Sequence, residues 1–202
     1  RNAALKAKTA AATIRSWNTE FVLLSAELNE SRQRALEVAL EGLTRFGRRL
    51  LGTELEFAYQ RGWSREKELE EVLEDGLQRD IMLGATQHGP HRADLKIRYD
   101  ERQARKLVSR GQQKLLASAM ILAATETAQT SLERPLLLLL DDPAAELDGE
   151  SLSRLMAAVA DLGCQVVATS LDRESVDVPG GAAVFHVEQG NLTIIQAPER
   201  TP

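Results

Sequence analysis

Hydrophobic residues in the first part of the chain follow the spacing of α-helices. Alanine, leucine, glutamate and arginine predominate over residues 2–51, and proline is absent, which favours helix. An apolar stripe at helical spacing is formed by Leu36, Val38, Leu40, Leu43 and Phe46. The pattern predicts a helical segment broken near residues 16–19, too irregular for a long coiled coil, that forms a short antiparallel arm. A charged amphipathic helix is predicted at 65–80.

Short segments elsewhere alternate polar and apolar residues, as half-buried strands do. Residues 54–60 and 94–99 show this alternation, and each is bounded by residues typical of turns or loops. Near the end of the chain, residues 183–187 and 192–195 flank a Gln-Gly-Asn turn at 189–191. We expect two strands in the first half and a closing hairpin in the second.

Continuous apolar runs separated by a helix mark the region between these strands. A helix is predicted from the loop at 109–112 to about residue 130. Residues 136–140 and 165–169 are predicted to be strands buried on both faces, as in a parallel sheet, with a helix at 150–162 between them. This strand–helix–strand order is typical of a right-handed crossover unit and predicts an α/β fold.

Composition restricts the environment of the protein. The chain has 202 residues, 43% of them hydrophobic, enough to bury the core of one domain with an appendage. Its longest apolar run is far too short to span a membrane, no secretion signal is apparent, and the single Cys164 excludes an internal disulfide. We therefore expect a cytoplasmic protein. Because the sequence opens at Arg1, without a methionine and inside a predicted helix, we also expect it to be a piece of a longer chain.

Two adjacent carboxylates end the first buried strand. Leucines occupy 136–140, and Asp141 and Asp142 follow directly. Ligands of open α/β sheets bind at the carboxyl ends of the strands. One carboxylate there can hold Mg²⁺, which prefers oxygen ligands, and a second can deprotonate an attacking water. A strand that simply ends in an acidic turn is the alternative.

Two further motifs flank these carboxylates. Residues 144–148 (Ala-Ala-Glu-Leu-Asp) follow them, and residues 109–112 (Ser-Arg-Gly-Gln) precede them by about 30 positions. A serine and a glycine at the start of a helix offer a hydroxyl, backbone N–H groups and the positive end of the helix dipole, which suit a phosphate. Taken alone, Ser-x-Gly-Gln also fits an ordinary helix cap.

In this order and at this spacing, the three motifs resemble the signature, Walker B and D-loop motifs of ABC-type ATPases. With residues 57–63 (Phe-Ala-Tyr-Gln-Arg-Gly-Trp) and 89–95 (Gly-Pro-His-Arg-Ala-Asp-Leu) added, the sequence resembles the C-terminal portion of the RecF family. The resemblance covers most of 54–195. It implies an α/β fold containing part of an ABC-type ATPase head (52–202), preceded by the end of a helical arm (1–51).

The resemblance also implies roles for individual residues. Asp141 would bind Mg²⁺, and Asp142 would be the catalytic base. Aspartate is one methylene shorter than the glutamate usual in ABC transporters, so we expect slow hydrolysis. The signature residues would contact ATP held by a second subunit, which makes dimerisation depend on ATP: Ser109, Arg110, Gly111 and Gln112. Glu146 and Asp148 would lie in the D-loop at the dimer seam. Thr169 would be a candidate switch residue.

Charge is unevenly distributed and suggests where DNA would bind. The chain carries a net charge of −5, yet residues 91–114 hold eight Lys or Arg against three Asp or Glu. Basic residues of this kind contact phosphates without reading sequence. The candidates are Arg92, Lys96, Arg98, Arg102, Arg105 and Lys106. Members of the RecF family are bacterial DNA-binding ATPases that help load recombinase at gapped DNA with RecO and RecR, so the resemblance implies the same partners. Solvated positions on an outer strand are the alternative for Lys96 and Arg98.

One motif of an ATPase is missing. No Gly-x-x-x-x-Gly-Lys-Ser/Thr sequence occurs in the chain, so the loop that grips the β- and γ-phosphates is not encoded here. In the RecF family that loop lies upstream, before the helical insertion. We therefore expect the chain by itself to bind ATP poorly and to hydrolyse essentially none.

Two other classes of protein remain open. The first is another ABC-head protein, either an SMC-like ATPase or a transporter subunit. A transporter should carry Leu-Ser-Gly-Gly-Gln and a switch histidine, and an SMC-like protein should show long heptad runs. The second is an interaction module without catalysis, in which the carboxylates serve structure alone.

Overall fold

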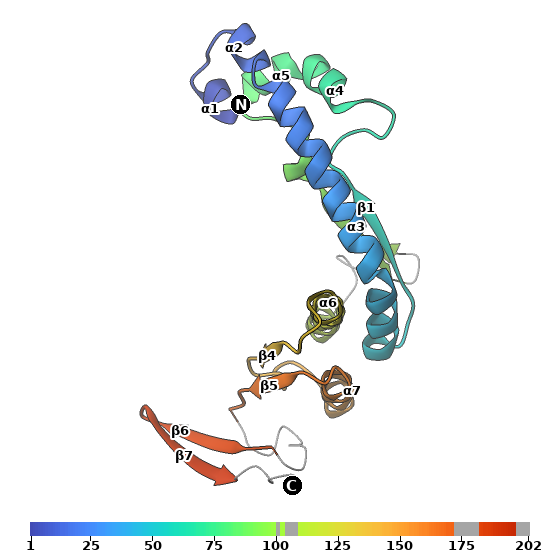
Figure 1. Cartoon of the computed structure of the whole chain (residues 1–202), viewed down its shortest axis with the longest axis vertical. Helices are drawn as coiled ribbons and strands as arrows, with labels where there is room; N and C mark the ends of the chain where they lie inside the picture. Colours follow the sequence, from blue (N-terminus) through green and yellow to red (C-terminus); the bar gives the residue numbers. More distant parts are fainter. Residues whose placement is uncertain (100–101, 104–108, 172–181, 197–202) are drawn as a thin grey trace. The chain divides into compact units, whose positions relative to one another are not determined.

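The computed structural model describes residues 1–99, 102–103, 109–171 and 182–196 (Figure 1). The chain forms two compact units, residues 1–134 and 135–202. The predicted boundary between residues 51 and 52 lies inside the first unit, at the end of its longest helix. In the described parts of the chain, no helix is both long and apolar enough to cross a lipid bilayer.

The first unit is organised around one long helix. After α1 (Asn2–Lys6) and α2 (Ala11–Arg15), α3 runs over 34 residues, Asn18–Leu51. The predicted break near 16–19 is confirmed, and α3 continues from it without interruption. The antiparallel arm stays a prediction. Gly52, in the left-handed conformation with φ 73°, ends the helix.

A small antiparallel sheet follows α3. β1 (Leu55–Gln60) pairs with β2 (Asp94–Tyr99), which pairs with the short β3 (Arg102–Gln103). The two predicted strands are confirmed. The predicted helix at 65–80 is instead two helices, α4 (Leu69–Asp75) and α5 (Leu77–Leu83). The chain bends between them at Gly76, a residue that weakens helices.

Two glycine-containing segments meet beside this sheet. The Gly89 nitrogen donates to the Gly62 carbonyl at 3.1 Å, and Gly89 immediately precedes the 3₁₀ turn η1 (Pro90–Arg92). The approach is so close that a Cβ on Gly62 would lie 2.2 Å from the Gly89 carbonyl oxygen. In the same segment, His91 Nε2 donates to the Thr86 carbonyl at 2.9 Å. In this structure His91 therefore braces the loop.

The last helix of the first unit packs along α3. α6 runs over Arg110–Leu132, as predicted, and its contact with α3 is the most extensive between helices of the unit. Gly42 permits the close approach, because a Cβ there would lie 3.3 Å from the Ala123 side chain. The ion pair of Arg45 with Glu126 links the same two helices.

The second unit contains the predicted strand–helix–strand motif. β4 (Leu137–Leu140) pairs in parallel with β5 (Gln165–Ala168), and α7 (Gly149–Ala160) connects them. β6 (Val184–Glu188) and β7 (Asn191–Gln196) form the predicted hairpin. Gln189 and Gly190 turn it with φ of 49° and 81°, as the tight turns of hairpins require.

The prediction that both parallel strands are buried on two faces is wrong. Leu138 is 7% exposed, whereas Leu137 and Leu139 are 56% and 68% exposed. Val167 of β5 is also exposed. Among the described residues β4 and β5 form a sheet of two strands, so one apolar face lacks a cover.

Candidate functional site

The predicted carboxylates and the candidate switch residue lie together at the ends of two strands. Leu140 of β4 is in register with Ala168 of β5, so the next residue of each strand emerges at the same edge. Thr169 N donates to the Leu140 carbonyl at 2.9 Å. The Thr169 hydroxyl donates to Asp141 Oδ1 at 2.7 Å and accepts from Asp142 N at 3.1 Å. One hydroxyl therefore holds both aspartates in place.

This network restricts what each group can do. A hydroxyl has a single proton to donate, and Thr169 gives it to Asp141. To bond a phosphate oxygen with that proton, Thr169 would have to release Asp141. The exposed Asp141 keeps Oδ2 as an oxygen ligand of the kind that Mg²⁺ takes. The described residues include no cluster of three or more Asp, Glu, His or Cys side chains suited to a metal.

The backbone after β4 adopts an uncommon conformation. Asp142 and Glu146 have positive φ values of 42° and 65°, which few residues other than glycine adopt. Two turns follow, closed by Ala145 N to the Asp142 carbonyl at 3.2 Å and Leu147 N to the Ala144 carbonyl at 3.3 Å. Such strain clusters at functional sites, and it supports a specialised role for residues 142–146.

Asp148 caps α7. Its Oδ1 accepts from Ser151 N at 2.8 Å, and its Oδ2 accepts from Ser151 Oγ at 3.0 Å. The bond from the Ser151 backbone, followed by that from the Ser151 side chain, lowers the pKa of Asp148. The observed contacts of this carboxylate are thus within its own helix, and its place at a dimer seam stays a prediction.

The cap gives a testable dependence on pH. The pKa of Asp148 is lowered in the folded chain, so the ionised carboxylate stabilises the fold when the pH is above the ordinary pKa of aspartate. This stabilisation is lost as the pH falls through the pKa of Asp148 in the folded chain. We expect the protection of the Ser151 amide against hydrogen exchange to fall as the pH drops below about 4, the ordinary pKa of aspartate. In Asp148→Asn this dependence should be flat. Asp161→Asn, at the other end of α7, is the control and should keep it. If amide protection of Ser151 depended on pH equally in both variants, the Asp148 carboxylate would not be the group responsible.

The predicted signature residues begin α6 in the first unit. Ser109 Oγ accepts from Gln112 N at 3.2 Å, and Gln112 Oε1 accepts from Ser109 N at 2.9 Å, a reciprocal capping box. The box uses the lone pairs of the hydroxyl and not its proton. It also uses Oε1 of Gln112 and not Nε2. Helix capping is therefore compatible with donation of two further hydrogen bonds to a phosphate.

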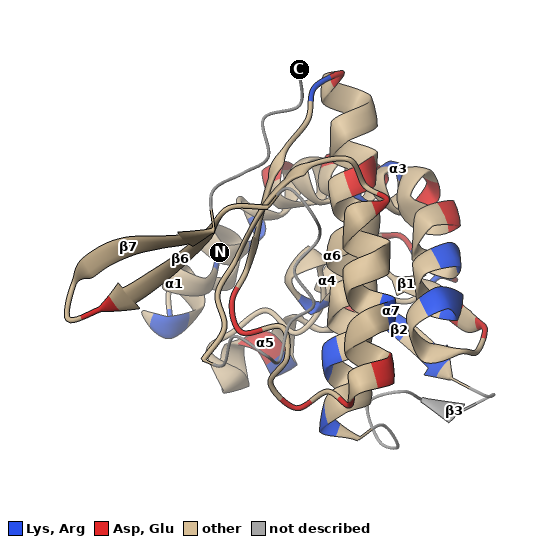
Figure 2. Ribbon diagram, turned by 90° about the horizontal axis from the view of Figure 1, so that it is seen from below, with Lys and Arg blue, Asp and Glu red and all other residues tan. Residues whose placement is uncertain are grey.

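The candidate DNA contacts are only partly described. Lys96 Nζ lies 2.6 Å from Asp94 Oδ2, and Arg98 Nη1 lies 3.4 Å from Glu56 Oε2. Arg92 donates to Gln87 Oε1 at 3.5 Å. The side chain of Arg102 and all of Arg105 and Lys106 lie outside the described residues. Basic residues, blue, and acidic residues, red, both occur on the helices in Figure 2. Charge alone therefore does not single out a nucleic-acid surface.

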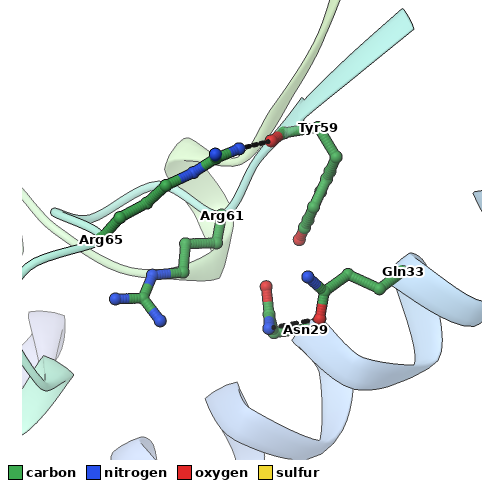
Figure 3. Close-up of a pocket in the computed structure, with 5 residues that line it drawn as sticks. All are labelled: Asn29, Gln33, Tyr59, Arg61 and Arg65. Carbon is green, nitrogen blue, oxygen red and sulfur yellow. Dashed lines mark hydrogen bonds between the residues drawn. The ribbon is translucent and has the colours of Figure 1, made fainter.

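Two groups of residues were missed from sequence. Arg1 and Asp80 form a buried ion pair at 2.6 Å. A cavity of about 380 Å³ is lined by Asn29, Gln33, Tyr59, Arg61 and Arg65 (Figure 3). The only available signal was the pair of arginines in the turn after β1, and it did not indicate that α3 completes the cavity.

Comparison with known proteins identifies relatives by sequence and by structure. No family model matches the chain. It is 37% identical over 188 residues to the DNA replication and repair protein RecF of Pseudomonas fluorescens, covering 91% of the chain and 51% of that relative. It is 32% identical over 203 residues to the RecF of Shewanella baltica, covering 97% and 56%. The chain thus spans about half the length of the curated relatives it matches.

Solved structures share the fold. The recombination mediator protein RecF with ATP, in the RecFOR pathway, matches with a TM-score of 0.77 and 23% identity, over 96% of this chain and 54% of that one. RecF-ATPrS matches with a TM-score of 0.76 and 21% identity, over 96% and 55%. The expected α/β fold is confirmed, and these RecF structures share it.

Proposed function

Because the chain belongs to the RecF family, matching about half the length of its relatives, we propose that it supplies the Walker B and signature motifs of a recombinational DNA-repair ATPase. The observation that carries this proposal is the network of Asp141, Asp142 and Thr169 at the ends of β4 and β5. A carboxylate pair at the ends of parallel strands is placed where α/β proteins bind nucleotides. In this role the protein acts in the bacterial cytoplasm.

The two aspartates have different roles in the proposed reaction. Asp141, oriented by Thr169, would hold Mg²⁺, which neutralises charge on the nucleotide phosphates when bound. Asp142 would accept a proton from the attacking water. Its backbone is in the left-handed region, with a φ of 42°. The short aspartate side chain limits its reach, and we expect slow turnover suited to a timed clamp.

The signature residues would act on the nucleotide of a second subunit. Ser109, Gly111 and Gln112 stand at the N-terminus of α6, where backbone N–H groups and the helix dipole favour an anion. Arg110 and Lys114 add positive charge beside them. ATP would then form part of the dimer interface, with Glu146 and Asp148 in the D-loop at its seam. The dimer would bind DNA through the basic candidates, with RecO and RecR as partners in loading recombinase.

The test is the mass in solution of the full-length protein carrying Asp142→Asn, with and without ATP. We expect a dimer with ATP and a monomer without it. Ser109→Arg should abolish the dimer, because it fills the position of the phosphate. Ser109→Asp keeps a capping side chain but repels phosphate, so it should abolish the dimer without unfolding α6. Ser131→Arg, at the opposite end of α6, should dimerise normally.

A monomer under all conditions would contradict the role of Ser109 in a second subunit. The alternative is an interaction module in which Ser109 and Asp148 only cap helices, a function that the two observed caps favour. In that case Asp142→Asn would leave nucleotide turnover of the full-length protein unchanged.

A further inference from the structure

A polar cavity in the first unit has a composition unlike that of a packing defect. It lies between α3 and the turn after β1 and has a volume of about 380 Å³. Two guanidinium groups, a phenol and two carboxamides line it: Arg61, Arg65, Tyr59, Asn29 and Gln33. None of these lining residues is acidic. Figure 3 shows the Tyr59 hydroxyl directed toward the amides of Asn29 and Gln33, with Arg61 and Arg65 to the left of these three residues.

Both arginines are held in place by their neighbours. Arg61 Nη2 donates to the Ser64 and Lys67 carbonyls, the latter at 3.1 Å, and its guanidinium lies 4.7 Å from the centre of the Trp63 ring. Arg65 Nη2 donates to the Tyr59 carbonyl at 3.1 Å. Fixed guanidinium groups lose little conformational freedom when they bind a ligand. The positive charge of the cavity is therefore preorganised.

Several buried polar atoms around the cavity lack partners. The Tyr59 hydroxyl, Arg61 Nε and Asn29 Oδ1 have no hydrogen-bond partner among the described residues. Buried polar atoms in folded proteins are almost always paired, so the two donors among them, the Tyr59 hydroxyl and Arg61 Nε, indicate a missing group with acceptor oxygens. The amides of Asn29 and Gln33 hydrogen-bond each other at 3.2 Å. Rotating both amides preserves that bond and turns Asn29 Nδ2 toward the cavity as another donor.

We propose that this cavity binds a phosphate group of a nucleic-acid backbone. Planar guanidiniums match the geometry of phosphate oxygens, and the phenol supplies a further donor. Such contacts position a nucleic acid without reading its sequence. The phosphate chemistry follows from the cavity itself, and the choice of nucleic acid as its source rests on the proposed function. The site is separate from the basic candidates at 92–106.

The test measures binding of a labelled duplex oligonucleotide, and of its single strand, to the full-length protein with ATP. Arg65→Gln should weaken binding about tenfold or more and reduce the slope of log affinity against log salt by about 1. Gln33→Glu, which places a negative charge on the cavity wall, should also weaken binding. Gln78→Glu adds the same charge on exposed α5 and should bind as the unsubstituted protein does.

Tyr59→Phe separates a ligand contact from a structural role. Because its hydroxyl is buried without a partner in the described chain, removing it should leave the thermal stability of the free protein unchanged or raised. The same variant should bind DNA more weakly. A loss of stability without DNA, together with unchanged affinity, would overturn the proposal.

The remaining outcomes distinguish this inference from the proposed function. Normal affinity and salt slope in Arg65→Gln and Gln33→Glu would overturn the cavity assignment, while an intact ATP-dependent dimer would leave the proposed function standing. Calorimetric binding of inorganic phosphate that Arg65→Gln abolishes, with DNA affinity unchanged, would also overturn the assignment to a nucleic-acid backbone. Absence of DNA binding by the unsubstituted protein would contradict both.

Discussion

Replacing Asp80 with alanine is expected to lower the free energy of unfolding by about 3–5 kcal/mol, because it leaves the charge of Arg1 buried without a carboxylate. The side chains of Arg1 and Asp80 are 3% and 1% exposed. Asp80 Oδ1 also accepts from Gln87 N at 3.0 Å, and Arg1 Nη1 donates to Thr86 Oγ1 at 2.7 Å. The substitution therefore breaks a buried network. Urea unfolding followed by circular dichroism measures the loss.

Asp75→Ala is the matched control, since it removes the same carboxylate from an exposed ion pair. Asp75 lies 2.7 Å from Lys67, and its side chain is 60% exposed. Exposed pairs contribute little to stability, because water screens the two charges. If Asp75→Ala and Asp80→Ala lost similar amounts of free energy of unfolding, burial of the Arg1–Asp80 pair would not be the cause of the loss in Asp80→Ala.

Gly62→Ala is expected to destabilise the first unit by about 3 kcal/mol or more, through backbone strain and overpacking together. Gly62 has a φ of 93°, and a Cβ there would lie 2.2 Å from the Gly89 carbonyl oxygen and 2.8 Å from the Ala93 nitrogen. Because both are backbone atoms, no side chain can rotate away. Thermal unfolding is the direct measurement.

Gly52→Ala isolates the effect of backbone conformation. Gly52 has a φ of 73°, and nothing lies within 4 Å of the position its Cβ would take. We expect a loss of about 1–2 kcal/mol, the cost of the left-handed conformation alone. If Gly62→Ala lost no more free energy of unfolding than Gly52→Ala, the close approach of residues 62 and 89 would not be a cause of the loss.

The elements predicted well from sequence are those in which local pattern decides structure. The alternation at 54–60 and 94–99 corresponds to β1 and β2, and the Gln-Gly-Asn turn to the final hairpin. The carboxylates after β4 and the residue after β5 could be placed at one edge, because parallel pairing aligns the ends of strands. Their joint hydrogen bonding through Thr169 required the register.

The features missed from sequence depend on contacts between distant segments. Asp80 looks like one more charged residue of an amphipathic helix, and its partner lies 79 positions away. The polar cavity likewise joins α3 to the turn after β1. The apolar run of β4 indicates that its residues can be buried, but it does not indicate whether a covering layer is present.

The length of α3 has a mechanical consequence. Its 34 residues make a rod of about 50 Å. Near one end it is clamped to α6 through Gly42 and Arg45, and at the other Asn18 is tied to Arg1 and Glu74. A tilt of about 5° imposed by α6 would displace the far end, about 38 Å from the clamp, by about 3 Å, given the rise of the helix. A small rearrangement at α6 would therefore produce a larger displacement at the far end of α3.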